Sequence, residues 1–295
     1  GIIDPVAEPK IVRQEGAVSL LEAARAPGAS AMVAAMDEAI GIADRLGIGW
    51  CSARNITHSG AIGYYALRAV HRGQIGIVIT ASGPLMAYQG TRVSGVSTNP
   101  VAIAAPSDGL PLLLDMSTSA VALGKIMAAK DAGSPIPEGW AIGSEGQPAT
   151  DPADVATLTP MGGPKGSGLS LMFEVLASVL AANPVIKEAF SGRKGIMNGV
   201  ALALNIGSFC DPKAFLMHIA ELSGALKGLP KAPETDEILM PGERGFRLAE
   251  KRKAAGIPLA AGTVSRLAAV AERFGVAQPV PVQAGGVELS RSAGA

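Results

Sequence analysis

The sequence is poor in aromatic residues, cysteine and histidine, and it carries no net charge. Aromatic side chains make up 4% of the 295 residues, and there are two cysteines and three histidines. Lys plus Arg and Asp plus Glu each number 25, and no basic run occurs. This balance argues against a nucleic acid or an acidic membrane surface as a partner. The scarcity of cysteine and histidine argues against a zinc site, and we predict no metal.

Long apolar runs are also absent. No stretch approaches the roughly 18 to 20 apolar residues that cross a membrane, and the start of the chain does not resemble a charged leader followed by an apolar segment. Cys51 and Cys210 lie far apart, each in an apolar context. We therefore expect two buried thiols in a cytoplasmic protein, ahead of a disulfide or a catalytic cysteine.

What the sequence does contain is typical of a globular protein that binds a small molecule. Hydrophobic residues make up 48% of the chain and charged residues 17%, and the 37 glycines favour close packing of backbone on backbone. Apolar periodicity predicts a helix over 30–47, a strand over 48–54, a helix over 60–73 and a strand over 75–82. This alternation predicts an α/β fold.

The rest of the chain continues the same pattern. We expect further strands over 101–106, 110–116 and 199–209, helices over 118–130 and 169–183, and two or three amphipathic helices after residue 211. Residues 132–168 are too rich in Gly, Pro and Asp for regular structure, and a connection of this length is usually functional. Residues 283–295 are expected to fray.

Several well-known catalytic motifs are missing. No G-x-G-x-x-G follows a predicted strand, so the Rossmann fingerprint is absent, and there is no P-loop G-x-x-x-x-G-K-[ST]. H-E-x-x-H, C-x-x-C and G-x-S-x-G are absent as well. A P-loop phosphotransferase and a zinc metalloprotease are therefore not supported.

The stretch "ITHSGAIGYY" places a histidine just before a predicted helix. Thr57 or Ser59 is expected to cap a helix beginning near Gly60, whose N–H groups suit a phosphate or carboxylate. His58 would then be a proton donor beside a bound ligand, or else a loop residue with a satisfied hydrogen bond. The spacing alone favours the loop residue.

Three other stretches contain polar residues that a ligand or ordinary local structure would explain. Thr98 lies in "STNP", which turn chemistry explains without a ligand. Three hydroxyl residues, 117–119, follow Asp115 at a predicted junction between strand and helix. They form either an N-cap cluster or a binding site for a phosphate. Lys165 lies in the turn "GGPKGSG", which is an anion site or a plain turn.

Taken together, these stretches resemble the malate/L-lactate dehydrogenase family of NAD(P)-dependent oxidoreductases, which is unrelated to the Rossmann lactate dehydrogenases. The resemblance runs in order through six motifs. They are "THSGAIGYY", "STNPVAIAAP", "LDMSTSAVALGKI", "IPEGWAIGSEGQPATDP", "GGPKGSGLSLM" and "MPGERGFRLAEKRKAAGIPL". This resemblance overturns the interpretation of His58 as a plain loop residue.

The resemblance implies a non-Rossmann, mixed-sheet NAD(P)-binding domain over 56–210 and a helical or mixed domain built from 1–55 and 211–295, usually in an intertwined homodimer. It implies NAD or NADP as cofactor, without indicating which of the two, and a small carboxylate as substrate. His58 would be catalytic and Thr98 would bind substrate. The cofactor-binding residues would be Ser59, Gly60, Ala61, Ile62, Ser117, Thr118, Ser119, Lys165, Gly166, Ser167, Gly168, Gly242, Glu243 and Arg244.

Two departures from the family bear on this expectation. Family members begin with several dozen more residues, including a Ser-His-Gly-x-x-x-Arg motif whose His can donate the proton and whose Arg holds the substrate carboxylate; the motif is not in these 295 residues. In addition, Ser97 replaces a Gly and Ser167 an aromatic residue.

The expected reaction is hydride transfer between nicotinamide and a 2-oxo or 2-hydroxy carboxylate of the malate, lactate or sulfolactate type. One alternative is reduction of a cyclic imine such as piperideine-2-carboxylate or pyrroline-2-carboxylate. The other is a catalytically impaired, nucleotide-binding homologue.

Overall fold

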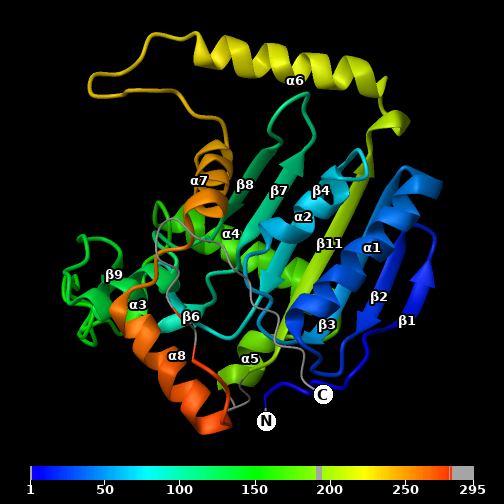
Figure 1. Ribbon diagram of the computed structural model, residues 1–295. Helices are drawn as coiled ribbons and strands as arrows, with labels where there is room; N and C mark the ends of the chain where they lie inside the picture. Colours follow the sequence, from blue (N-terminus) through cyan, green and yellow to red (C-terminus); the bar gives the residue numbers. More distant parts are fainter. Residues whose placement is uncertain (1, 191–194, 279, 281–295) are drawn as a thin grey trace.

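The computed structural model describes residues 2–190, 195–278 and 280, and its main feature is a seven-stranded mixed sheet (Figure 1). The strand order is β1-β2-β3-β11-β4-β7-β8. The β2–β3 pair is parallel and all other pairs in this sheet are antiparallel. The bounds, in this order, are Lys10–Glu15, Val18–Glu22, Ile48–Ile56, Met197–Asn205, Gln74–Ala81, Val101–Ala105 and Leu112–Met116.

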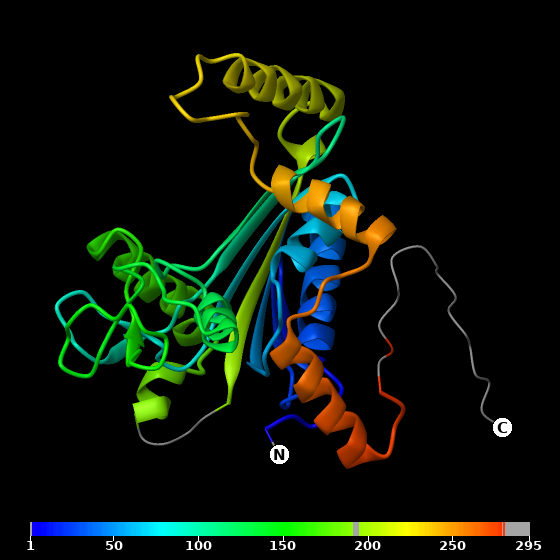
Figure 2. The same cartoon turned by 60° about the vertical axis from the view of Figure 1, so that its left-hand side comes forward.

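Helices cover both faces of this sheet, as Figure 2 shows from the side. Helices α1 (Gly28–Leu46) and α2 (Gly63–Val70) pack on one face, and α4 (Pro164–Glu174) with the π-helical turn η1 (Val175–Val179) packs on the other. The core between them consists largely of alanine and aliphatic side chains. A Cβ placed on Gly49 would lie 1.9 Å from the carbonyl oxygen of Ala39. Small residues therefore let backbones approach closely, in line with the low aromatic content.

A smaller mixed sheet forms a second layer and has its own apolar core. Its strand order is β6-β5-β10-β9, and the β5–β10 pair is parallel. The four strands are short: Ser94–Val96, Met86–Ala87, Thr157–Leu158 and Ala141–Ile142. The two mixed sheets confirm the predicted α/β class and the mixed pairing.

The C-terminal part of the described chain is helical. Helix α5 (Val185–Phe190) precedes β11, and the single-turn η2 (Ile206–Ser208) follows it. Three helices then come in succession: α6 (Pro212–Lys227), α7 (Glu243–Ala255) and α8 (Ala261–Phe274). Figure 1 shows α6 across one end of the large sheet, and none of its residues is buried. Helix α8 returns to α3 (Leu123–Ala132), where Arg266 pairs with Asp131 at 2.7 Å.

Several predicted helix starts were wrong. Helix α1 begins at Gly28 instead of Ser30, because the Thr57 hydroxyl accepts from the N–H of Gly28. Helix α2 spans Gly63–Val70 instead of 60–73. Its N-cap residue is Ile62, which makes no side-chain cap hydrogen bond, so neither Thr57 nor Ser59 caps it as predicted. The helix expected from residue 118 begins at Leu123, and the one expected from 169 begins at Pro164.

The two cysteines differ from the prediction in one respect. Both are free, and Cys51 is buried as expected, but Cys210 is exposed. Burial, together with the nearby Glu38 carboxylate, raises the pKa of the Cys51 thiol to about 12. Cys51 is therefore an inert core residue.

Three remaining expectations concern the whole chain. The boundary predicted between residues 55 and 56 falls at the end of β3, so strands from both predicted domains share the large sheet. The expected fraying of 283–295 lies outside the described residues. Among the described helices, none is long and apolar enough to span a membrane.

Candidate active site

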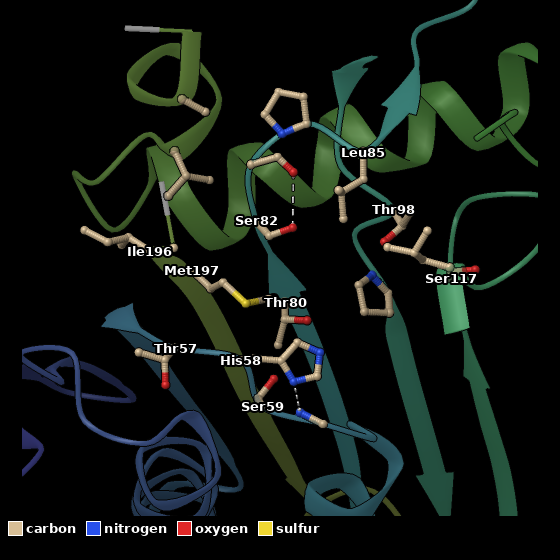
Figure 3. Close-up of a pocket in the computed structure, with 18 of the residues that line it drawn as sticks. Thr57, His58, Ser59, Thr80, Ser82, Leu85, Thr98, Ser117, Ile196 and Met197 are labelled. Atoms are coloured by element: carbon tan, nitrogen blue, oxygen red, sulfur yellow. Dashed lines mark hydrogen bonds between the residues drawn. The ribbon is translucent and has the colours of Figure 1, made fainter. Parts of the chain in front are cut away.

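A cavity of about 1140 Å³ opens at the edge of the large sheet where β3, β4 and β8 end and β7 and β11 begin (Figure 3). The chain segments that leave these strand ends, the start of α3, helix α5 and the first residues of the chain form its wall. Its polar lining includes Thr57, His58, Ser59, Thr80, Ser82, Ser94, Thr98, Asp115, Ser117 and Asn183.

His58 lies in the segment that follows β3 and is exposed to the cavity. The backbone N–H of Gly60 donates to its Nδ1 at 3.1 Å (Figure 3). Since Nδ1 accepts this hydrogen bond, the neutral ring carries its proton on Nε2. His58 therefore has one N–H left to donate to a ligand.

The residues on either side of His58 are held in place. The Thr57 hydroxyl accepts from the N–H of Gly28 at 2.9 Å and donates to the carbonyl of Ala26 at 3.0 Å. On the other side, the Tyr65 hydroxyl donates to the carbonyl of Ser59 at 2.5 Å. The His58 segment is thus tied to the starts of both α1 and α2.

The start of α2 already has an anion partner. The N–H of Gly63 donates to Asp115 Oδ2 at 2.8 Å, and Asp115 lies near the end of β8. The carboxylate predicted for this helix end is therefore supplied by the protein itself. Ile62, predicted to contact the cofactor, is 2% exposed and belongs to the core.

Thr98 and the hydroxyl cluster at 117–119 are hydrogen-bonded to each other in the wall of the cavity. Both the N–H and the hydroxyl of Thr118 donate to the carbonyl of Thr98 at 2.9 Å. The hydroxyl of Thr98 has no partner among the described residues, while Ser119 donates to the Ser117 hydroxyl at 3.0 Å. Thr98 and Ser117 line the cavity, whereas Thr118 and Ser119 are buried beneath it.

The predicted turn at residues 165–168 supports this cluster from outside the cavity. A Cβ on Gly166 would lie 2.4 Å from the carbonyl oxygen of Thr118, so only glycine allows this approach. Ser167 is buried and donates to the carbonyl of Gly163 at 3.3 Å. Lys165 and Gly168 do not line the cavity either, and Lys165 is exposed.

The predicted contacts at residues 242–244 lie toward the other end of β8. The N–H of Leu113 donates to the carbonyl of Pro241 at 3.0 Å. The Glu243 carboxylate accepts from Lys227 at 2.8 Å, from the N–H of Met240 at 3.0 Å and from Arg247. These partners lower the pKa of Glu243 to about 2. None of Gly242, Glu243 and Arg244 lines the cavity.

Sequence reasoning missed part of the lining. Ile2 and Ile3, Ser82, Asn183 and Met197 all border the cavity. Ser82 follows β4, Met197 begins β11, and Asn183 is hydrogen-bonded to residues of β3 and β11. No motif marked these residues, because their position depends on strand order. Ser82 also exchanges a hydrogen bond of 2.5 Å with Ser97, the buried residue that departs from the family pattern.

Two absences hold for the part of the chain that the structure describes. No Lys or Arg lines the cavity. No group of three or more His, Cys, Asp or Glu side chains could hold a metal ion. Hydroxyl and N–H donors are therefore what the described wall offers to an anionic ligand.

Comparison with known proteins identifies the protein as a dehydrogenase. The chain belongs to the malate/L-lactate dehydrogenase family, whose model matches residues 1–268. It is similar to the malate dehydrogenase of Pyrococcus abyssi, with 37% identity over 279 residues that cover 90% of this chain and 77% of the relative. The crystal structure of malate dehydrogenase from Entamoeba histolytica superposes with a TM-score of 0.88 at 28% identity, covering 95% of this chain and 83% of that one.

Other relatives are named for other substrates and for both cofactors. The ureidoglycolate dehydrogenase (NAD(+)) of Escherichia coli O157:H7 is 32% identical over 231 residues, which cover 76% of this chain and 66% of the relative. The (2R)-3-sulfolactate dehydrogenase (NADP(+)) of Chromohalobacter salexigens is 32% identical over 249 residues, covering 82% of this chain and 72% of the relative.

Proposed function

We propose that the protein transfers a hydride between the nicotinamide of NAD(P) and a small 2-oxo or 2-hydroxy carboxylate of the malate, lactate or sulfolactate type. The observation that carries the proposal is the placement of His58, with a free Nε2–H, in a large cavity at the strand ends. The relatives' names supply the substrate class and the two cofactors.

The cavity fits a dinucleotide together with a small acid. Its volume of about 1140 Å³ exceeds the roughly 300–1,000 Å³ usual for a site that takes one small ligand. Ser117, the backbone N–H groups of Ser59 and Ala61, and Gly124 in the first turn of α3 supply donors and close-approach points of the kind that phosphate and ribose need. When bound, the cofactor supplies or accepts the hydride.

His58 is proposed as the acid and base. In reduction, the carbonyl oxygen gains electron density as hydride reaches the carbon, and the imidazolium form of His58 gives up its Nε2 proton to complete the hydroxyl, which leaves a neutral ring protonated on Nδ1. The hydrogen bond from Gly60 to Nδ1 belongs to the other neutral tautomer and is absent in this step. Thr98, whose hydroxyl is free of partners among the described residues, is proposed to hold the substrate. Ser59, Gly60, Ala61 and Ser117 are proposed to contact the cofactor directly.

The other predicted cofactor residues are proposed to act from behind the wall. Thr118 and Gly166 fix the position of Thr98 and Ser117 through the contacts described above. An indirect role in cofactor binding, through the structure behind the cavity wall, is also proposed for Ile62, Ser119, Lys165, Ser167 and Gly168. A more remote role of this kind is proposed for Gly242, Glu243 and Arg244.

Three further points complete the proposal. Residues 56–210 are proposed to bind the cofactor, and 1–55 with 211–295 to form the second unit of a non-Rossmann fold. A homodimer is proposed, for which the unburied helix α6 is a candidate contact.

A substrate panel tests the function. Oxaloacetate, pyruvate, sulfopyruvate and piperideine-2-carboxylate are offered with NADH and with NADPH, and absorbance at the nicotinamide band is followed. We expect oxidation of one cofactor by a 2-oxo acid. No turnover with any pair, together with no dinucleotide binding by calorimetry, would rule the proposal out.

A further inference from the structure

A chain of side-chain hydrogen bonds runs from β2 to the wall of the cavity and ends at Asn183. This residue lines the cavity. Its Nδ2 donates to Oδ1 of Asn55 at 3.0 Å and to Oδ1 of Asn198 at 2.8 Å. Both N–H bonds of the Asn183 amide are therefore used inside the protein.

The neighbouring groups fix which way each amide faces. Asn55 donates its Nδ2 to both oxygens of the Glu22 carboxylate, at 2.9 and 3.0 Å, and so presents its Oδ1 to Asn183. The backbone N–H of Asn55 donates to Asn198 Oδ1 at 3.1 Å, and Asn198 Nδ2 donates to Ser178 at 3.0 Å. A carboxylate only accepts and a backbone N–H only donates, so turning either amide over would break hydrogen bonds.

The backbone at Asn183 is held as firmly. Ala182, in the turn that follows η1, lies in the left-handed region with φ of 55°. The N–H of Asn183 donates to the carbonyl of Ser178 at 2.9 Å. Two residues on, the N–H of Val185 donates to the buried Glu174 carboxylate at 3.2 Å, and Ser178 donates to the same carboxylate at 3.0 Å. The amide of Asn183 is thus positioned from both its backbone and its side chain.

The Oδ1 atom of Asn183, a residue that lines the cavity, makes no hydrogen bond to the described part of the chain. Among the described residues, Gln74 Oε1 is the one buried side-chain polar atom without a partner. Asn183 Oδ1 has no partner among them either, so it is not buried. Because Nδ2 faces the protein interior, the side chain can offer the cavity a hydrogen-bond acceptor and no donor.

We propose that Asn183 is a specificity-determining residue, whose Oδ1 accepts from a carboxamide N–H of the bound ligand and disfavours a carboxylate at the same place. The proposal rests on the dehydrogenase function given above. A carboxamide can come from two sources, the nicotinamide ring of the cofactor or an amide-bearing 2-oxo acid.

Two matched pairs of ligands distinguish the sources. The first pair is NADH and its 3-acetylpyridine analogue, in which an acetyl group replaces the carboxamide; affinities are measured by calorimetry. The second pair is 2-oxosuccinamate and oxaloacetate, which differ by an amide and a carboxylate; kcat/KM is measured for each. The variants are Asn183→Ala and the control Val185→Ala, which alters the same wall at an apolar side chain.

We expect the wild type to prefer the carboxamide member of one pair by about three- to tenfold, the effect of one neutral hydrogen bond. N183A should abolish the preference and V185A should keep it, even where it weakens both ligands. No preference in the wild type, or a preference that survives in N183A, would overturn the proposal, and absence of the preference in the wild type does so even if N183A does not fold. Turnover without any preference counts against Asn183 alone, whereas no binding and no turnover counts against the function as well.

Discussion

The backbone N–H of Gly60 donates to Nδ1 of His58, two residues earlier in the chain, at 3.1 Å. The hydrogen bond selects one tautomer of a ring that borders the cavity, and it leaves Nε2–H as the donor. Protonation of Nδ1 would break this hydrogen bond, so the acid and base role proposed for His58 would be coupled to the conformation of the segment 58–60.

The tautomer can be observed directly. In the protein without ligands, at a pH where the ring is neutral, ¹⁵N NMR of labelled histidine should show His58 protonated on Nε2. His71 and His218 give separate signals, which the variants His71→Gln and His218→Gln assign. A His58 protonated on Nδ1 would show that the Gly60 hydrogen bond does not form.

Removal of the imidazole should slow the chemistry. We predict that His58→Ala lowers kcat by roughly 10²–10⁴, as expected for a lost acid and base, with little change in dinucleotide affinity. Steady-state kinetics and calorimetry measure the two effects. An unchanged kcat would assign the proton transfer to another group.

The Asp115 carboxylate should stabilise the start of α2. We expect Asp115→Ala to lower the free energy of unfolding by about 1 kcal/mol, because the N–H of Gly63 loses its partner and the helix end its anion. Urea denaturation measures this. Asp108→Ala, which removes an exposed carboxylate from the β7–β8 hairpin, is the matched control and should have almost no effect; equal losses in the two variants would contradict the role.

Close packing leaves no room for a side chain at Gly49. At Gly49, a Cβ would lie 1.9 Å from the carbonyl oxygen of Ala39, so Gly49→Ala should destabilise the fold by about 3 kcal/mol or more. Gly245 in α7 has open space around it, and Gly245→Ala should be neutral or stabilise by up to about 1 kcal/mol. Thermal denaturation of both variants compares them, and similar melting temperatures would refute the packing argument.

Glu243 should contribute to stability in a defined pH range. Its pKa in the folded protein is about 2, against 4.5 as the ordinary value, because Lys227, the N–H of Met240 and Arg247 favour the ionised form. A depressed folded-state pKa gives stability that is present above 4.5 and is lost as the pH falls toward 2. The stability difference between wild type and Glu243→Gln should therefore shrink over this range in urea titrations. A difference that does not vary with pH would argue that the ion pairs do not form.

Much of the fold could be predicted from the sequence, because local signals determine much of it. The apolar, β-branched run over 75–82 became β4, and Gly47, with φ of 85°, ends α1 as predicted. Helix starts failed where a distant residue supplied the cap: Thr57 serves α1 and Asp115 serves α2. Such partners lie 29 and 52 residues away in sequence, and no local pattern shows them.

The candidate site shows the same division. His58, Thr98 and Ser117 were found through motifs, and the structure brings them to one cavity. Asn183 was not found, because its significance depends on two other amides from β3 and β11 that orient it. A motif identifies the residues of a family site, whereas a wall residue is defined by tertiary packing.

Transfer of deuterium tests the central claim most directly. The protein is incubated with a 2-oxo acid and NADH or NADPH that carries deuterium at C4 of the nicotinamide, in each of its two stereochemical forms. We predict that one form delivers its deuterium to C2 of the 2-hydroxy acid, as seen by mass spectrometry and NMR. Product without deuterium from either form, or no product from any 2-oxo acid, would contradict the account.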